Sequence, residues 1–151
     1  MTSVRRRRVL LAEDSELFAE VLRDLIEADD RLEVCGVARD GREAVRLVAS
    51  LKPDIVVMDV LMPVMDGLAA TSAIMEHHPT PILILSSDPR QRTGQLSMMA
   101  LERGALDVLP KPDHALLRRE QQAGLLARVR LLSTMPVSPR PAVEEAELAR
   151  P

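Results

Sequence analysis

Acidic, hydroxyl and lysine side chains follow short apolar runs at four places in this sequence, and together they could do phosphoryl chemistry. Glu13 and Asp14 follow VLLA, Asp59 follows IVVM, Ser86 ends a run that begins with PILIL, and Lys111 follows DVLP. Three carboxylates in one crevice would repel one another and be driven toward protonation unless a cation lay among them. Mg²⁺ takes oxygen ligands and often bridges carboxylates to a phosphoryl group, so we expect it as the cofactor.

Each of these side chains has an expected role in such a site. Asp59 stands alone after an apolar run, so it is the predicted nucleophile and would become an aspartyl phosphate. Glu13 and Asp14 form a pair suited to metal ligation. Ser86 would donate to a phosphoryl oxygen, and Lys111 would neutralise its charge. Taken singly, any of them could be a helix cap or a surface charge, and only the combination favours a phosphoacceptor site.

Short apolar runs alternate with stretches of helical periodicity along the chain. Strands are predicted at residues 9–12, 32–38, 55–58, 81–85 and 107–109, each followed by a helix, the last from about residue 114 to 132. The first helix is marked by six apolar residues at helical spacing: Leu17, Phe18, Val21, Leu22, Leu25 and Ile26. Continuous apolar strands separated by helices indicate a doubly wound α/β domain, with a five-stranded parallel sheet and helices on both faces. In such a sheet the functional crevice lies outside the carboxyl ends of the strands, where the polar residues converge.

Composition sets the expected domain boundaries. Residues 1–7 form a basic lead, residues 8–132 the domain, and residues 133–151 a Pro-rich linker or disordered tail. One Phe, no Tyr and no Trp argue against base stacking with single-stranded nucleic acid, and a net charge of -3 gives no general field for DNA. No apolar stretch approaches the ~20 residues that span a bilayer, and a single cysteine, Cys35, fits a reducing cytoplasm. We therefore expect a cytoplasmic protein without nucleic-acid or membrane partners.

The same segments resemble the receiver domain of two-component response regulators. AED at 12–14, MDVLMPVMDG at 58–67, the SS pair after PILIL and LPKP at 109–112 agree with that family in kind, order and spacing. The resemblance covers residues 8 to about 132 and implies a flavodoxin-like fold that takes a phosphoryl group from a sensor histidine kinase and switches its partner interactions.

The resemblance also assigns residues. By likeness Asp59 is the phosphoacceptor, and Glu13 and Asp14 are the acidic magnesium pair. The backbone carbonyl of Leu61 matches the third protein ligand to the metal. Ser86 matches the switch hydroxyl and Lys111 the lysine that contacts the phosphoryl group, with a cis bond expected between residues 111 and 112.

A closer likeness is to the receiver portion of chemotaxis-type protein-glutamate methylesterases. It rests on LEVCGVARDGREAV, HHPTPILILSS, GALDVLPKP and VRLLSTMPV. After Val137 only 14 residues remain, and they contain no G-x-S-x-G nucleophile elbow. Beyond its own phosphoryl transfer and dephosphorylation we therefore expect no enzyme activity, with an esterase domain as a missing or downstream effector.

Three positions depart from the pattern of the family. Val108 replaces the aromatic ring whose rotation reports phosphorylation, so a swinging-ring switch cannot operate as usual. Glu13 replaces the commoner aspartate and keeps its charge. Leu61 lies two residues after Asp59, where this subfamily often has a polar or acidic side chain.

Two other functions stay open at this point. Val108 motivates a receiver that no longer switches and serves as a docking or adapter domain. A magnesium-dependent aspartyl phosphatase is the enzyme alternative, but that family needs a second aspartate two residues after the nucleophile, where this chain has Leu61.

Overall fold

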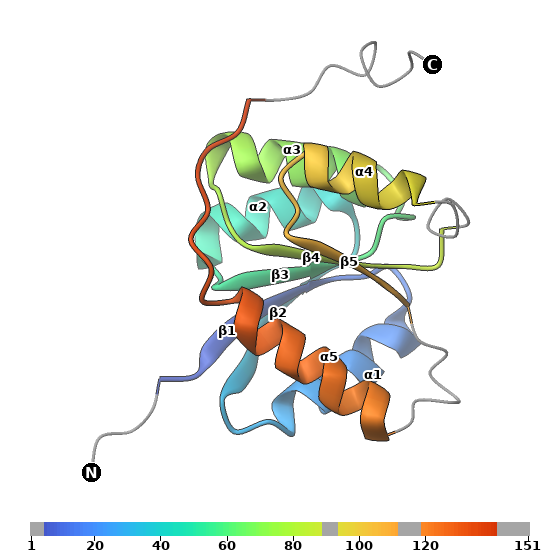
Figure 1. The fold of residues 1–151 in the computed structure, drawn as a ribbon, viewed down its shortest axis with the longest axis vertical. Coiled ribbons are helices and arrows are strands. Elements are labelled where there is room, and N and C mark those ends of the chain that lie inside the picture. Colours follow the sequence, from blue (N-terminus) through green and yellow to red (C-terminus); the bar gives the residue numbers. More distant parts are fainter. Residues whose placement is uncertain (1–4, 89–93, 112–118, 142–151) are drawn as a thin grey trace.

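Five parallel strands form a single sheet in the computed structural model, which describes residues 5–88, 94–111 and 119–141. Their bounds are β1 Arg7–Ala12, β2 Leu32–Ala38, β3 Ile55–Met58, β4 Ile82–Ser86 and β5 Asp107–Pro110. All neighbouring pairs are parallel, and the order across the sheet is β2-β1-β3-β4-β5. The predicted five-stranded parallel sheet is confirmed (Figure 1).

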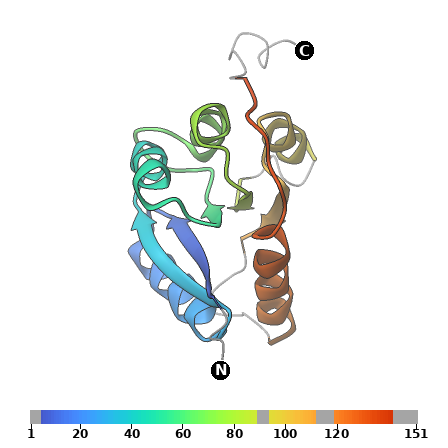
Figure 2. The same ribbon diagram turned by 90° about the vertical axis from the view of Figure 1, so that its left-hand side faces the viewer.

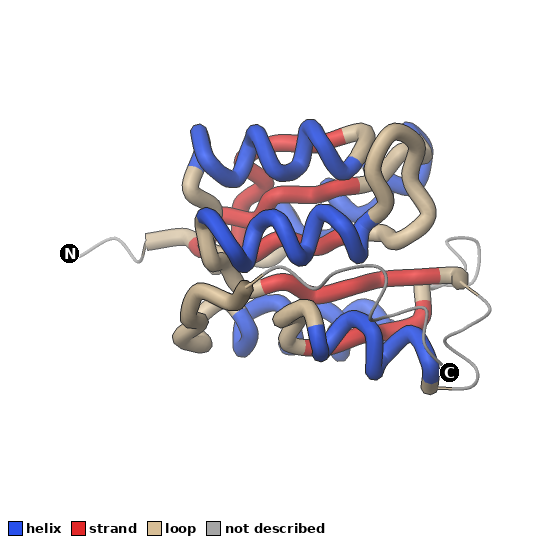
Figure 3. Tube along the Cα trace, turned by 90° about the horizontal axis from the view of Figure 1, so that it is seen from above, coloured by secondary structure: helices blue, strands red, loops and turns tan. Residues whose placement is uncertain are grey.

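Five helices cover both faces of this sheet. They are α1 Glu16–Glu27, α2 Gly41–Leu51, α3 Gly67–His77, α4 Gln95–Glu102 and α5 Arg119–Leu132. The helices α1 and α5 lie on one face, and α2, α3 and α4 lie on the other (Figure 1). Figure 3 shows from above how helices lie over the strands. The predicted start of the last helix, near residue 114, lies outside the described residues.

The central strands contain continuous apolar runs because each face of the sheet has its own core. In β1, Val9 and Leu11 pack on the side of α1 and α5, whereas Leu10 and Ala12 pack on the side of α2, α3 and α4. The strands β3 and β4 alternate in the same way. Since side chains along a strand point to opposite faces in turn, a continuous apolar run is what a doubly covered strand requires.

One helix-face prediction is wrong. Leu17 was expected on the apolar side of the first helix, but its side chain is 59% exposed. Phe18, Leu22 and Ile26 do form the buried stripe of α1. Leu17 directly precedes Phe18, so its side chain is turned about 100° around the helix axis from the buried stripe.

Side-chain caps start three helices directly after the loops at the carboxyl edge of the sheet. The side chains of Ser15, Asp40 and Asp66 accept hydrogen bonds from backbone N–H groups at the starts of α1, α2 and α3. Such caps satisfy donors that the first turn of a helix leaves free. They fix where each loop ends, and so they limit how far the polar residues in those loops can move.

The strand order reverses direction between β1 and β3. From β1 the chain first goes outward to β2, then returns past β1 to β3 and continues to β4 and β5. The loops after β1 and β3 therefore diverge to opposite faces, and in open α/β sheets the functional crevice lies at such a point. The residues that follow β1 and β3 lie at this point.

The segment after α5 runs from one face of the sheet to the other (Figures 1 and 2). Val137 packs against the core beneath α2, α3 and α4. The backbone N–H of Arg140 donates to Met75 O at 2.9 Å, and its guanidinium donates to the carbonyls of Leu101 and Glu102. This part of the predicted linker therefore lies against the domain. Residues 142–151 lie outside the described residues, and the proposed domain boundaries stay a prediction.

Among the helices that the structure describes, none is long and apolar enough to cross a membrane.

Candidate functional site

Three carboxylates meet at the carboxyl edge of the sheet, where the strand order reverses. Glu13 and Asp14 follow β1, and Asp59 follows β3, which is paired with β1. One oxygen from each carboxylate lies within 4.8 Å of the others. Glu13 and Asp59 are buried, at 2% and 5% exposure, whereas Asp14 is exposed. The sequence prediction that these three residues converge is confirmed.

Lys111 brings the positive charge into this group. Its ammonium pairs with Glu13 Oε1 and lies 3.1 Å from Asp59 Oδ2. The lysine is placed by the sheet itself, because its backbone N–H donates to Ser86 O at the end of β4. One ammonium is thus shared between two buried carboxylates whose oxygens lie within 4.8 Å of each other, where two full negative charges would repel by roughly 3.5 kcal/mol or more at an effective dielectric of about 20.

The protonation of this group follows from its burial and its charges. Burial raises the pKa of Glu13, and the charge of Asp59 adds to the effect, against the opposing influence of Lys111 and of the Ser15 N–H. For Lys111, burial acts against the charged form, but the hydrogen bond to Glu13 and the charges of Asp59 and Glu13 outweigh it, and its pKa is raised. The lysine is therefore a fixed cation that lies among three carboxyl groups.

Backbone contacts hold Asp59 in place. Its N–H donates to Ala12 O at 3.0 Å, and its Oδ1 accepts from the N–H of Val60 at 2.8 Å. Gly67, which begins α3, approaches so closely that a Cβ atom there would lie 2.0 Å from Asp59 O. Only glycine fits this position, which accounts for the DG at the end of the MDVLMPVMDG stretch.

The other predicted site residues lie on the same edge of the sheet. Ser86 is fully buried at the end of β4, and its Oγ accepts from the N–H of Asp88 at 2.9 Å. Leu61 lies in the loop after β3 with a 51% exposed side chain. Val108 in β5 is half-buried and packs against the core on the side of α2, α3 and α4. The predicted cis bond at residue 112 lies outside the described residues.

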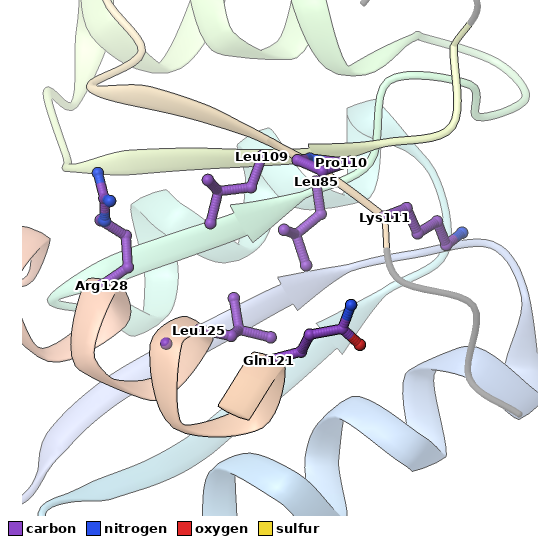
Figure 4. Close-up of a pocket in the computed structure, with 8 residues that line it drawn as sticks. Leu85, Leu109, Pro110, Lys111, Gln121, Leu125 and Arg128 are labelled. Carbon is purple, nitrogen blue, oxygen red and sulfur yellow. The ribbon is translucent and has the colours of Figure 1, made fainter. Parts of the chain in front are cut away.

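A pocket of about 480 Å³ lies next to this group, between the ends of β4 and β5 and helix α5. Figure 4 shows its three leucines, Leu85, Leu109 and Leu125, between the sheet and α5, with Lys111 on one side. The lining is mainly apolar. Lys111 lines this pocket, but its ammonium pairs with Glu13 and Asp59. The charged group and the apolar pocket therefore lie side by side and share this one residue.

The donor set fits a hard divalent cation. All three side-chain ligands offer carboxylate oxygens, one of them is exposed to water, and two are buried with a single shared ammonium. Mg²⁺ is commonly held by one or two carboxylates, keeps several waters and adds contacts to substrate phosphates. Three carboxylates beside a single ammonium favour the binding of such a cation.

One protein-family model matches most of this chain. The model for the response regulator receiver domain matches residues 9–120. The chain belongs to the response regulator receiver family. The matched span runs from β1 into α5 and includes every candidate site residue named above.

The curated relatives are named methylesterase/glutaminases, and this chain matches one part of each. A protein-glutamate methylesterase/protein-glutamine glutaminase 2 of Photobacterium profundum is 43% identical over 147 residues, which is 92% of this chain and 37% of the relative. One from Pyrococcus abyssi is 40% identical over 134 residues, or 87% of this chain and 36% of the relative. The chain thus spans little more than a third of the length of these relatives.

Solved structures show the same fold. The response regulator domain of Thermotoga maritima CheB superposes with a TM-score of 0.79 at 34% identity, covering 87% of this chain and 99% of that one. The Borrelia burgdorferi CheX–CheY–BeF3–Mg+2 complex matches with a TM-score of 0.73 at 28% identity, covering 87% of this chain and 92% of that one. The flavodoxin-like receiver fold predicted from the sequence is confirmed.

Sequence reasoning missed two residues that shape the site. Phe18 was assigned to the apolar face of the first helix, but its ring also lies beneath the Lys111 ammonium. Gly67 was read as part of a family motif, with no account of the atom it approaches. Phe18 carried a usable signal, because it is the only aromatic residue in the chain.

Proposed function

We propose that this receiver accepts a phosphoryl group on Asp59 from a sensor histidine kinase and changes its partner contacts in response. The observation that supports it most strongly is the meeting of Asp59 with Glu13, Asp14 and Lys111 at the point where the strand order reverses. Burying Asp59 beside an ammonium and two further carboxylates lowers the stability of the fold. Such an arrangement is therefore more typical of a functional site than of a structural one.

The chemistry assigns a task to each described residue. An oxygen of Asp59 forms the new bond to phosphorus while the bond between phosphorus and the donor imidazole nitrogen breaks, and that nitrogen takes up a proton from water. Lys111 contacts an oxygen of the incoming group and balances its charge. Ser86 is the hydroxyl that turns from its present contact with the Asp88 N–H to donate to the phosphoryl group.

Glu13, Asp14 and Asp59, together with the backbone carbonyl of Leu61, are the proposed holders of Mg²⁺. When bound, the ion supplies charge neutralisation for phosphoryl oxygens. The Borrelia complex supports this assignment, since that structural neighbour was solved with BeF3 and Mg+2. Within this chain, the raised pKa of Glu13, caused chiefly by burial, is the effect that a neighbouring cation would oppose.

The relatives suggest the setting. Their methylesterase/glutaminase names and the 37% coverage support a role in a chemotaxis-like pathway in the cytoplasm, in which an esterase domain is the proposed effector and esterase activity is not assigned to these residues. Phosphorylation adds about -1.5 to -2 charges, which would draw Ser86 and Lys111 toward Asp59 and shift the loops after β3 and β4.

A second candidate function rests on one residue. Val108 is aliphatic and packed against the core, so it has no ring to move between a buried and an exposed position. A receiver that binds the phosphoryl group but does not transmit the event would act as an adapter. Retention of the complete charged set favours the switching receiver over this alternative.

Labelling with a small phosphodonor tests the phosphoacceptor assignment. With acetyl phosphate and Mg²⁺, the wild type should gain one phosphoryl group that maps to Asp59, and Asp59→Asn should gain none. Asp66→Asn is the matched control, because it removes a nearby carboxylate yet keeps the cap of α3. Labelling of Asp59→Asn at the wild-type rate would overturn the assignment.

A further inference from the structure

The only phenyl ring of the chain lies against the only lysine of the site. The Lys111 ammonium is 4.3 Å from the centroid of the Phe18 ring, within the range in which a cation is attracted to a ring face. The other lysine of the chain is Lys52, at the end of α2, far along the sequence from this group. The ring belongs to α1, which follows β1, and the ammonium belongs to the residue after β5, so the contact joins segments whose strands are separated in the sheet by β3 and β4.

Packing alone does not require an aromatic residue here. Phe18 is 5% exposed and belongs to a cluster whose other members are aliphatic. On the same helix, Leu22 and Ile26 fill the next positions of the buried stripe. A leucine at position 18 would also be an apolar member of that stripe. The ring differs from it in one property, because a ring face attracts a cation.

Hydrogen bonds connect the start of α1, which carries the ring, to Glu13 of the site. Glu13 Oε2 accepts from the N–H of Ser15 at 2.9 Å, and Ser15 Oγ accepts from the N–H of Phe18 at 3.3 Å. The Phe18 ring meets Lys111, and Lys111 pairs with Glu13 Oε1. These four residues form a closed circuit, so that the carboxylate that binds the ammonium also fixes the start of the helix that carries the ring.

A lysine side chain has four rotatable bonds, and its ammonium is strongly hydrated when it reaches water. The ammonium of Lys111 contacts two carboxylates and also lies over the ring. Together they limit the directions that the ammonium can take. An aliphatic side chain at position 18 would leave only the carboxylates to hold it.

We infer that Phe18 is a positioning residue, which holds the Lys111 ammonium toward Asp59 for contact with a phosphoryl oxygen. The inference rests on the proposed function, and it adds a residue of α1 to the group that determines phosphoryl binding. The ring acts through Lys111 and touches no reacting atom.

The contact itself is measured without any phosphoryl group. Protons above the face of an aromatic ring resonate upfield, and with two lysines in the chain the ε-methylene signals are easily assigned. The Lys111 signal should lie upfield of Lys52 in the wild type and should move to the Lys52 position in Phe18→Leu. Coincident signals in the folded wild type would overturn the inference.

Binding of beryllofluoride in the presence of Mg²⁺ tests the consequence. Phe18→Leu should weaken it about three- to tenfold, the range expected for a partly desolvated cation–ring contact. Leu22→Val is the matched control, since it trims the next buried position of α1 and should leave the affinity unchanged. In a Lys111→Met background Phe18→Leu should have no further effect, because the ring acts through the lysine.

Two results would overturn this assignment. One is a folded Phe18→Leu protein that binds beryllofluoride as tightly as the wild type, and the other is an equal loss in the Lys111→Met background. Phe18→Met serves as a second variant if the leucine protein does not fold. A wild type that does not bind beryllofluoride at all would instead overturn the proposed function, while the lysine spectrum still decides whether the contact exists.

Discussion

Two aspartates stand at opposite ends of the same four-residue strand. Asp54 directly precedes β3 and Asp59 directly follows it. Asp54 faces basic residues, since Arg5 and Arg7 pair with its carboxylate and the Arg8 N–H donates to it at 2.9 Å. Its negative charge is matched locally.

Asp59 is in the reverse situation. It is more deeply buried than Asp54, with a side chain 6% exposed against 16%, and it has one ammonium that Glu13 shares. A carboxylate matched by arginines at the amino edge of the sheet stabilises the fold, whereas carboxylates in excess at the carboxyl edge need a cation from outside. On the proposed function, the two aspartates that flank β3 therefore differ in kind: Asp54 stabilises the fold, and Asp59 binds a cation and accepts the phosphoryl group.

Replacing each aspartate by asparagine gives the largest contrast. Asp59→Asn should abolish phosphoryl labelling, yet without Mg²⁺ its free energy of unfolding should fall by no more than about 1 kcal/mol, because removal of the charge also relieves repulsion with Glu13. Asp54→Asn should label normally and lose about 1–2 kcal/mol, because charged hydrogen bonds are removed. Labelling with acetyl phosphate and urea unfolding measure the two effects. Equal losses of stability in the two variants would contradict the comparison.

The second prediction concerns the close approach of backbone to Asp59. Gly67→Ala should lower the free energy of unfolding by about 3 kcal/mol, since its Cβ would lie 2.0 Å from Asp59 O and force the chain apart. Gly124→Ala is the matched control in α5, where a Cβ meets nothing within 4 Å, and it should stabilise by about 0.5–1 kcal/mol. Thermal unfolding of both variants makes the test, and a neutral Gly67→Ala would show that this edge is less rigid than described.

The third prediction concerns the metal. Glu13→Gln should weaken Mg²⁺ binding by tenfold or more, because it removes a buried carboxylate from the donor set. Glu16→Gln is the control, since it neutralises an acidic residue that begins α1 and is 80% exposed. Calorimetric titration with Mg²⁺ compares the two. An unchanged affinity in Glu13→Gln would remove Glu13 from the proposed ligands.

The fourth prediction tests a matched carboxylate away from the site. Asp29 pairs with Arg130 of α5 and accepts from the Arg31 N–H, and although burial opposes this, these contacts lower its pKa below the ordinary 3.8. Because the folded pKa is depressed, the stabilisation is present above the ordinary value and is lost as the pH falls through the folded value. Asp29→Asn should therefore cost about 1–2 kcal/mol at neutral pH, with the difference from the wild type shrinking in acid. Urea unfolding at several pH values measures it, and a difference that grows in acid would contradict the sign.

The smallest expected effect concerns two arginines that cap helix ends. The Arg8 guanidinium donates to carbonyls at the end of α2, and that of Arg140 does so at the end of α4. Arg140→Gln should loosen the last turn of α4 by about 0.5–1 kcal/mol and leave α2 unchanged. Amide hydrogen exchange resolves the two helices, and equal protection of α4 in both proteins would show that the cap does not stabilise it.

The sequence predicted most of what depends on local pattern. Continuous apolar runs such as residues 55–58 identified strands covered on both faces, and the polar residues after them identified the edge where Glu13, Asp14, Asp59 and Lys111 meet. That inference succeeded because the carboxyl ends of parallel strands share one edge, whatever the order of the strands.

What the sequence did not reveal depends on three-dimensional distance. Apolar periodicity gave Phe18 and Leu17 the same role, although one lies under Lys111 and the other faces solvent. The contact of Arg140 with α3 and α4 joins segments that are far apart in the chain, and a Pro-rich composition predicts a linker without saying what it lies against. Contacts of this kind are determined by tertiary packing and leave no local signal.

Amide spectra recorded while Mg²⁺ and then beryllofluoride are added would show whether the carboxylates around Asp59 bind a cation and respond to a phosphoryl mimic. We expect Mg²⁺ to shift the resonances of residues 13, 14 and 59, and beryllofluoride to extend the shifts to residues 86 and 111 and on to α4. Asp59→Asn should remove the second response. Shifts that stop at the pocket would favour the adapter that binds without transmitting. A wild-type spectrum that Mg²⁺ leaves unchanged would contradict the claim that the unmatched carboxylates at this edge exist to bind a cation.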